Sequence, residues 1–172
     1  MLFRSFLDCV HGANNCEDPS KVMKAFQSSV FCLQPPGDSL TRRSIFDSIL
    51  AGCIPVFFHQ GSAYEQYVWN LPKDHTTYSL FIPLNDLKEK KVLINETLLR
   101  VPKKEVLAMR EEVIKLIPKI VYADPRYRLE SLEDAFDIAV KGVLQRVEAV
   151  RREIKEGTDP SIGFAELNGT KF

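Results

Sequence analysis

The segment 34–47 holds residue types that are suited to binding a phosphorylated ligand. A Pro-Pro-Gly-Asp-Ser turn containing Gly37 and Ser39 precedes Arg42 and Arg43, which we expect in the first turn of a helix. The unpaired N–H groups and the dipole at a helix N-terminus favour an anion, whereas arginine charge there opposes the dipole. An anion bound between the two arginines and the amides would account for arginines at this end, because a guanidinium binds phosphate oxygens with two hydrogen bonds. The segment is therefore a candidate phosphate site.

Asp47 lies one helical turn beyond Arg43. A carboxylate there is placed to accept hydrogen bonds from both hydroxyls of a ribose. The alternative is that the arginines are solvated or form ion pairs with Asp38 and Asp47, since Arg43 and Asp47 have the spacing of an ion pair within one helix face. The sequence contains neither a Walker loop nor the GxGxxG fingerprint of dinucleotide folds.

A second group of candidates lies in the segment 59–78, which is rich in aromatic residues. His59 directly follows an apolar run and is placed to contact a ligand, and Tyr64, Tyr67, Trp69 and Tyr78 follow it. Aromatic faces suit stacking on a uracil ring or on a sugar. The alternative is that buried rings pin this loop to the sheet. Both interpretations stay open from the sequence.

The elements that position these residues form a βαβ unit. A helix capped by Ser20 precedes a buried strand over 30–33. A second helix, capped by Ser39 or Thr41, ends at Gly52 and leads to a strand over 54–58. Strand, helix and strand within about thirty residues imply parallel strands and a right-handed crossover. Ligands of such sheets bind at the carboxyl ends of the strands, where both candidate groups fall.

The rest of the chain predicts two further strands and two long helices. We expect strands over 78–82 and 92–94, a helix starting at Pro102, and a last helix over 132–156. The last helix carries an inward-facing stripe of Phe136, Val140, Val143, Val147 and Val150. We expect one partial domain over 1–157 and a flexible tail over 158–172. So small a sheet indicates a fragment of a longer protein.

Composition and cysteines restrict the function further. The charges balance, with 23 Lys plus Arg and 23 Asp plus Glu, which offers no global attraction to nucleic acid or to anionic membranes. No apolar run has the length of a membrane helix. Cys9 and Cys16 flank a polar loop and are placed to close a disulfide, whereas Cys32 and Cys53 lie in apolar surroundings and are expected as buried free thiols. No metal-binding cysteine or histidine pattern is present, and Asn95 and Asn168 begin N-glycosylation acceptor sites.

Long stretches of the chain resemble plant exostosin-type (GT47-type) glycosyltransferases, in particular xyloglucan galactosyltransferases. The resemblance is carried by FCLQPPGDSLTRRSIFDSILAGCIPVFFHQGSAYEQYVW and, further along, by TTYSLFIP, VYADPR and DAFDIAV. It implies the Rossmann-like C-terminal half of a two-domain, GT-B-type enzyme, which binds a UDP-sugar. In similar enzymes an acidic residue five positions before a glycine holds the ribose, and Asp47 stands in that position before Gly52, with aspartate in place of the more usual glutamate.

The resemblance also implies a reaction and a place in the cell. Arg42 and Arg43 would stabilise the diphosphate without a metal, and a hexose, expected to be galactose from UDP-galactose, would be transferred with inversion to a polysaccharide such as xyloglucan. The base is expected outside this chain, in an absent half, and a membrane anchor is expected there too. The protein would face the Golgi lumen, which agrees with the acceptor sites at Asn95 and Asn168 and with a Cys9–Cys16 disulfide. The competing hypothesis is a truncated, inactive α/β interaction module.

Overall fold

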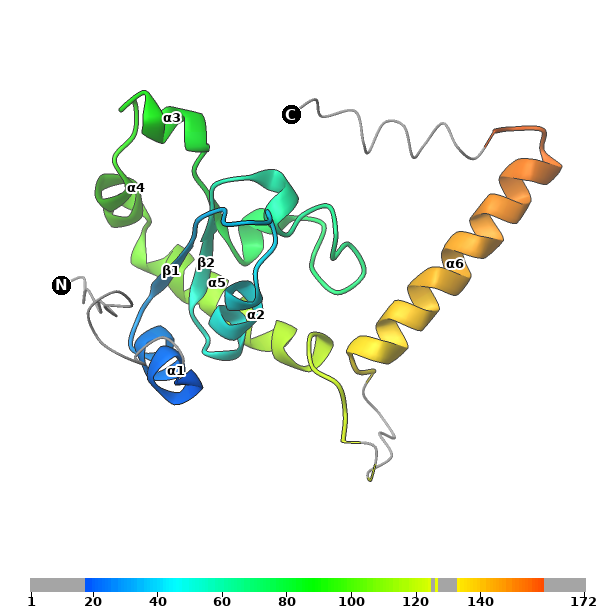
Figure 1. Ribbon diagram of the computed structural model, residues 1–172, viewed down its shortest axis with the longest axis horizontal. Helices are drawn as coiled ribbons and strands as arrows, with labels where there is room; N and C mark the ends of the chain where they lie inside the picture. Colours follow the sequence, from blue (N-terminus) through cyan, green and yellow to red (C-terminus); the bar gives the residue numbers. More distant parts are fainter. Residues whose placement is uncertain (1–17, 125, 127–132, 160–172) are drawn as a thin grey trace.

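A three-stranded parallel sheet forms the centre of the protein, as the computed structural model of residues 18–124, 126 and 133–159 shows (Figure 1). The strands are β1 (Phe31–Gln34), β2 (Ile54–Phe57) and β3 (Leu80–Phe81), in the order β1-β2-β3. All pairs are parallel, with Phe31 opposite Ile54 and Val56 opposite Leu80. The predicted α/β class with a parallel sheet flanked by helices is confirmed.

Helix α2 (Arg43–Leu50) makes the crossover from β1 to β2. Its side chains Ile45 and Ile49 are fully buried against the sheet. The helix ends at Gly52, whose φ of 68° lies in the left-handed region that a side chain disfavours. This part of the fold agrees with the sequence prediction.

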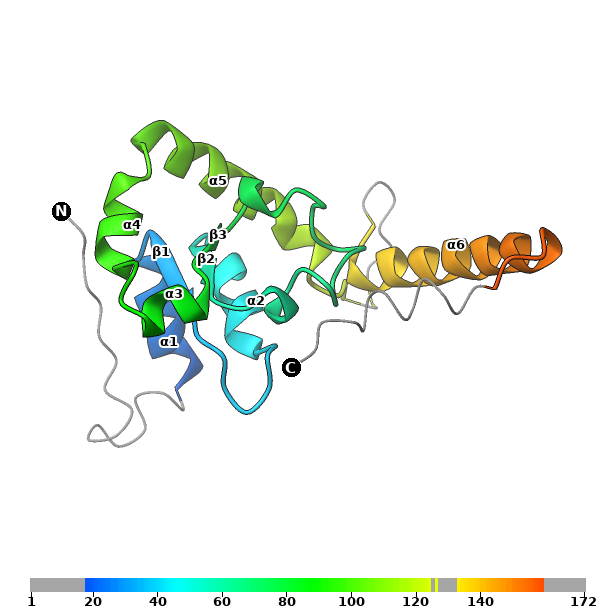
Figure 2. The ribbon, with the colours of Figure 1, turned by 90° about the horizontal axis from the view of Figure 1, so that it is seen from above.

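Helices cover both faces of the sheet (Figure 2). Helices α2 and α5 (Lys103–Leu116) pack on one face, in a core that includes Ile49, Phe57 and Val113. Helices α3 (Leu84–Lys88) and α4 (Ile94–Arg100) pack on the other face, around Val56 and Leu98. The sheet therefore lies inside a layered arrangement, with the loops at its carboxyl edge left to form a site.

Three local predictions are corrected. Asp18, not Ser20, caps α1 (Pro19–Gln27), because its carboxylate accepts the Ser20 N–H at 2.9 Å. Neither Ser39 nor Thr41 caps α2, whose first flanking residue is Arg42, with no side-chain cap. The segment 92–94 is no strand: α4 begins at Ile94, since Ile94 and Leu98 share one helix face toward the core.

Helix α6 (Ala135–Lys155) departs most from expectation. It extends away from the sheet (Figures 1 and 2), and the stripe predicted to face inward is largely exposed, with Phe136 at 61% and Val143 at 49%. Its opposite side meets the body at Gly142, where an added Cβ would lie 2.3 Å from the Trp69 ring. The periodicity correctly indicated a helix, but four of the five residues of the predicted stripe are exposed in the part of the chain that the structure describes.

A disulfide joins Cys32 of β1 to Cys53, directly before β2, with their Cα atoms 5.9 Å apart. The prediction that these two cysteines are free thiols is therefore wrong. Cys32 lies opposite Pro55, which is two residues after Cys53. Since side chains two residues apart along a strand point to the same face, the two cysteines lie on one side of the sheet. Cys9, Cys16, Asn168 and the tail beyond 159 fall outside the described residues. Among the helices of residues 18–159 that the structure describes, none has the length and apolar composition of a membrane span.

Candidate functional site

The carboxyl edge of the sheet brings the two predicted groups of site residues together. The segment 35–42 follows β1, and the segment from His59 onward follows β2. They touch at Leu40, whose Cδ1 would lie 2.9 Å from a Cβ added at Gly61. They are also joined by a hydrogen bond between the hydroxyls of Thr41 and Tyr67, at 2.8 Å. The two loops that carry these groups therefore lie side by side.

Arg42 lies across the turn after β1. Its Nη1 donates to the Pro35 carbonyl at 3.4 Å, and its guanidinium covers Gly37, where an added Cβ would lie 3.2 Å from Arg42 Cζ. Ser39 Oγ donates to the Thr41 carbonyl at 2.5 Å, so its hydroxyl shapes the turn. Since no side chain caps α2, its first N–H groups are not satisfied in that way and face the loop.

Arg43 pairs with Asp47 in this structure, as the alternative interpretation held. Nε of Arg43 lies 3.2 Å from a carboxylate oxygen of Asp47, and the two side chains are 75% and 21% exposed. An exposed pair one turn apart on a helix contributes only a few tenths of a kcal/mol. The pair therefore holds the arginine weakly and leaves it available to a stronger anion.

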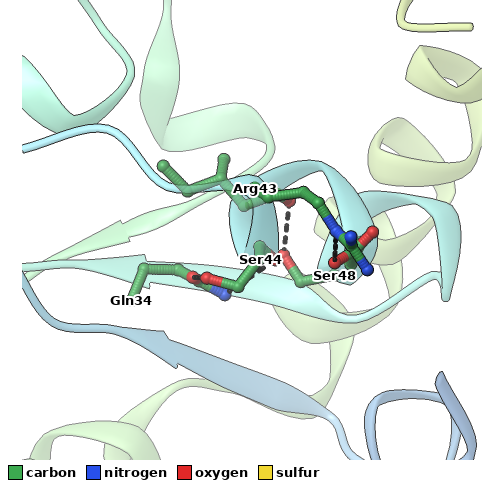
Figure 3. A network of polar contacts seen from close by, with 6 residues as sticks. Gln34, Arg43, Ser44 and Ser48 are labelled. Atoms are coloured by element: carbon green, nitrogen blue, oxygen red, sulfur yellow. Dashed lines mark hydrogen bonds and ion pairs between the residues drawn. The ribbon is translucent and has the colours of Figure 1, made fainter. Parts of the chain in front are cut away.

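Sequence reasoning missed a buried polar pair beneath this surface. Gln34, the last residue of β1, is 2% exposed. Ser44 Oγ donates to Gln34 Oε1 at 2.7 Å, and Gln34 Nε2 donates to the Ser44 carbonyl at 3.3 Å (Figure 3). A glutamine at the end of an otherwise apolar predicted strand, followed by serine in the next helix, was the available signal.

His59 and Tyr64 both serve the packing of the loop after β2. His59 is exposed, and its Nδ1 accepts the Gly61 N–H at 3.0 Å, which caps the short 3₁₀ helix Gln60–Ser62. Tyr64 stacks on His75 with ring centroids 4.0 Å apart and shares a hydrogen bond of 2.9 Å with Ser79. Burial raises the pKa of Tyr64 to about 12.

The aromatic residues of this loop are mostly engaged with the protein. Tyr78 is 1% exposed, and burial raises its pKa strongly. Tyr64, Tyr67 and Tyr78 line a cavity of about 40 Å³, which has room for a water rather than for a base or a sugar. These contacts favour the interpretation in which the rings pin the loop to the sheet.

Two other expectations concern the glycosylation acceptor at Asn95 and metal binding. Asn95 is exposed in the first turn of α4. In the described residues, no group of three or more His, Cys, Asp or Glu side chains is arranged to hold a metal ion.

Comparison with known proteins identifies a family and its members. The Exostosin GT47 domain matches residues 3–97. Xyloglucan galactosyltransferase MUR3 of Arabidopsis thaliana is 54% identical over 166 residues, covering 96% of this chain and 27% of that protein. Probable xyloglucan galactosyltransferase GT15 of Arabidopsis thaliana is 60% identical over 151 residues, covering 86% of this chain and 32% of that protein.

A relative with a different named activity also matches. Xyloglucan-specific galacturonosyltransferase 1 of Arabidopsis thaliana is 44% identical over 143 residues, covering 83% of this chain and 21% of that protein. The chain thus spans about a third or less of the length of these curated relatives.

Proposed function

Because this chain belongs to the exostosin GT47 family, we propose that it is the donor-binding part of a glycosyltransferase that acts on a cell-wall polysaccharide. The observation that carries the proposal is the uncapped N-terminus of α2, which lies at the carboxyl edge of a parallel sheet beside Arg42, Arg43 and Asp47. Anionic ligands of α/β sheets bind at such places. We propose further that the sheet belongs to the C-terminal half of a GT-B-type enzyme.

In this proposal the donor is a UDP-sugar. Its diphosphate lies over the turn, where the backbone around Gly37 and Ser39 and the guanidinium groups of Arg42 and Arg43 supply hydrogen-bond donors. Binding separates Arg43 from Asp47, and the freed carboxylate accepts the ribose hydroxyls. His59 and Tyr64 lie on the neighbouring loop, where we place the base or sugar of the donor.

The proposed reaction inverts the anomeric carbon. A base from the remainder of the enzyme takes the proton of an acceptor hydroxyl, and the resulting oxygen nucleophile attacks the anomeric carbon. The bond from that carbon to the diphosphate oxygen breaks, and UDP leaves with the electron pair. Arg42, Arg43 and the amides of α2 stabilise the charge that grows on the leaving group, which is the work a metal does in other enzymes.

The names of the relatives support the substrates that we propose. Two of them are named as galactosyltransferases of xyloglucan, so we propose UDP-galactose as donor and xyloglucan as acceptor. The third relative is named for galacturonic acid, a sugar that differs from galactose by oxidation at one carbon. The donor sugar is therefore the part of the proposal that a direct comparison of the two UDP-sugars must decide.

The disulfide supports a place in the secretory pathway. Disulfides persist in oxidising compartments and are rare in the cytosol. The Cys32–Cys53 bond and the exposed Asn95 in its acceptor site fit the Golgi lumen, where we propose that the whole protein works, anchored by a segment outside this chain. No role for nucleic acid enters the proposal.

Ligand-induced stabilisation of the 172-residue chain tests the donor site. UDP is expected to raise Tm. At a UDP concentration a hundred times Kd, binding adds about 2.7 kcal/mol to the free energy of unfolding. Replacing both Arg43 and Asp47 by alanine should abolish the shift. The matched control is Glu96→Ala with Arg100→Ala, which removes an exposed ion pair of the same spacing from α4 and should leave the shift intact.

The same experiment distinguishes the proposed donor-binding function from the competing one, an inactive interaction module. An inactive interaction module would draw on the exposed apolar stripe of α6, and UDP would not change its Tm. A shift that survives in the Arg43→Ala, Asp47→Ala chain would contradict the site, and an equal shift with ADP and GDP would contradict the choice of uridine.

A further inference from the structure

A buried amide lies at the carboxyl end of β1, under the proposed donor site. Gln34 is 2% exposed and faces the same side of the strand as Cys32. Its partner in the register, Phe57 on β2, is fully buried and apolar. Burying an amide costs free energy unless its polar atoms are hydrogen-bonded, and an apolar residue would fill this position without that cost. Gln34 therefore supplies something other than burial.

Both polar ends of the amide are used by one residue. Oε1 accepts from Ser44 Oγ at 2.7 Å, and Nε2 donates to the Ser44 carbonyl at 3.3 Å. A carbonyl only accepts, so the amide has one orientation that satisfies both contacts. Ser44 is the second residue of α2, and the pair closes a ring between the strand end and the first helical turn (Figure 3).

The apolar contacts of α2 do not fix the helix in this way. Ile45 and Ile49 are fully buried, but hydrophobic burial is non-directional and tolerates small rotations of a helix about its axis. Paired hydrogen bonds are directional and act over a few tenths of an ångström. The ring at Ser44 therefore ties the first turn of α2, which carries the uncapped N–H groups and Arg43, to the end of β1.

We infer that Gln34 and Ser44 are positioning residues for the donor diphosphate: they hold the first turn of α2 in the orientation that its anion requires. The inference rests on the proposed function. Neither side chain touches the ligand in this arrangement, since Gln34 is buried and its amide is occupied by Ser44. Their effect reaches the diphosphate through Arg43 and the α2 backbone.

Calorimetric titration of the full chain with UDP, below Tm of every variant, tests the inference. Ser44→Ala should raise the Kd for UDP by about tenfold, the loss that corresponds to one hydrogen bond in a binding equilibrium. Ser44→Thr keeps the hydroxyl and should restore most of the affinity. The matched control is Ser48→Ala, one turn along α2, which removes a buried hydroxyl bonded at 2.7 Å to the Ile45 carbonyl of its own helix. It should leave Kd unchanged, whatever it does to Tm.

A double-mutant cycle removes dependence on any single variant. Gln34→Met keeps the length of the side chain without its hydrogen bonds and should weaken UDP binding by the same factor as Ser44→Ala. The double variant should be no weaker than either single one, since the pair acts as a unit.

The outcomes separate this inference from the function on which it rests. Wild-type binding with unchanged Kd in both Ser44→Ala and Gln34→Met overturns the inference alone, and so does an equal loss in Ser48→Ala. A wild-type chain that binds no UDP overturns the proposed function and the inference with it.

Discussion

Arg43 lies beside one negative charge in the free protein and, by our proposal, beside a larger one when the donor is bound. Its contact with Asp47 is exposed and therefore weak, whereas a diphosphate offers several oxygens and more than one charge. The sequence identified both residues but did not choose between their two roles, because the spacing of an ion pair and the spacing of a ribose–phosphate clamp are the same. The role that each residue takes depends on whether the ligand is bound.

Tyr64 makes the stability of the fold sensitive to alkaline pH. Burial raises its pKa to about 12 from the ordinary tyrosine value of 10.0. Since the folded state holds the proton more tightly, its contribution is complete below pH 10 and is lost as pH rises through 12. We expect the Tm of wild type to fall steeply over that interval, and that of Tyr64→Phe to fall less.

The same variant should be less stable near neutral pH, by about 1 kcal/mol, because it lacks the hydrogen bond to Ser79. Thermal melts at pH 8 and pH 11 measure both effects as differences from wild type, so that changes at other groups cancel. Tyr67→Phe is the control for the hydrogen bond: its hydroxyl also bonds a side-chain hydroxyl, that of Thr41, and the variant should share the loss at pH 8. Parallel alkaline losses in wild type and Tyr64→Phe would contradict this assignment.

At the scale of elements, the covalent tie between β1 and β2 is the feature that the sequence did not reveal. Parallel strands cannot be joined by a tight hairpin, and here the connection runs through α2. The disulfide closes that crossover across 21 residues of chain. It ties the two strands together near their starts, at the edge of the sheet opposite to the loops that form the site.

Removing the tie should destabilise the fold without changing the site directly. The chain-entropy model gives about 3 kcal/mol for a closed loop of this size. We expect Cys32→Ala with Cys53→Ala to lower the free energy of unfolding in urea by about that amount, and to leave the Kd for UDP unchanged at temperatures where the chain is folded.

Reduction of the wild-type chain by dithiothreitol should lower stability similarly, and should lower the stability of the double variant less. A wild-type chain insensitive to the reductant, with the disulfide shown by mass spectrometry to be cleaved, would contradict the stabilising role.

The elements themselves were largely predictable, and their errors have specific causes. Both strands of the βαβ unit, α2 and its end at Gly52 follow from apolar runs and from a glycine that tolerates positive φ. The Cys32–Cys53 disulfide was missed because it depends on the register of two adjacent strands. Cys32 and Cys53 lie near the starts of these strands, and the register brings them together, but tertiary contacts set that register and the sequence alone does not reveal it. The segment 92–94 was misassigned because a short run of three apolar residues begins a strand and a helix equally well.

At the scale of the whole molecule, the sheet and its covering helices form one body, and α6 projects from it (Figure 2). Apolar residues at Phe136, Val140, Val143 and Val147 recur at the spacing of a packed helix, so the sequence was sufficient to define an apolar face. It was not sufficient to place that face, because periodicity records what a helix can bury and not what lies beside it. Gly142, which admits Trp69, is one of the places where α6 meets the body.

The contrast between two helical valines tests this arrangement. Val113 of α5 is fully buried, whereas Val143 of α6 is 49% exposed. Alanine at Val113 should lower the free energy of unfolding by about 2 kcal/mol, through lost burial and the cavity that remains. Alanine at Val143 should change it by no more than about 0.5 kcal/mol. Helix propensity favours both changes equally, so the difference between the variants reports packing alone. Urea unfolding at low protein concentration measures it, and equal losses at the two positions would mean that the stripe of α6 is covered in solution.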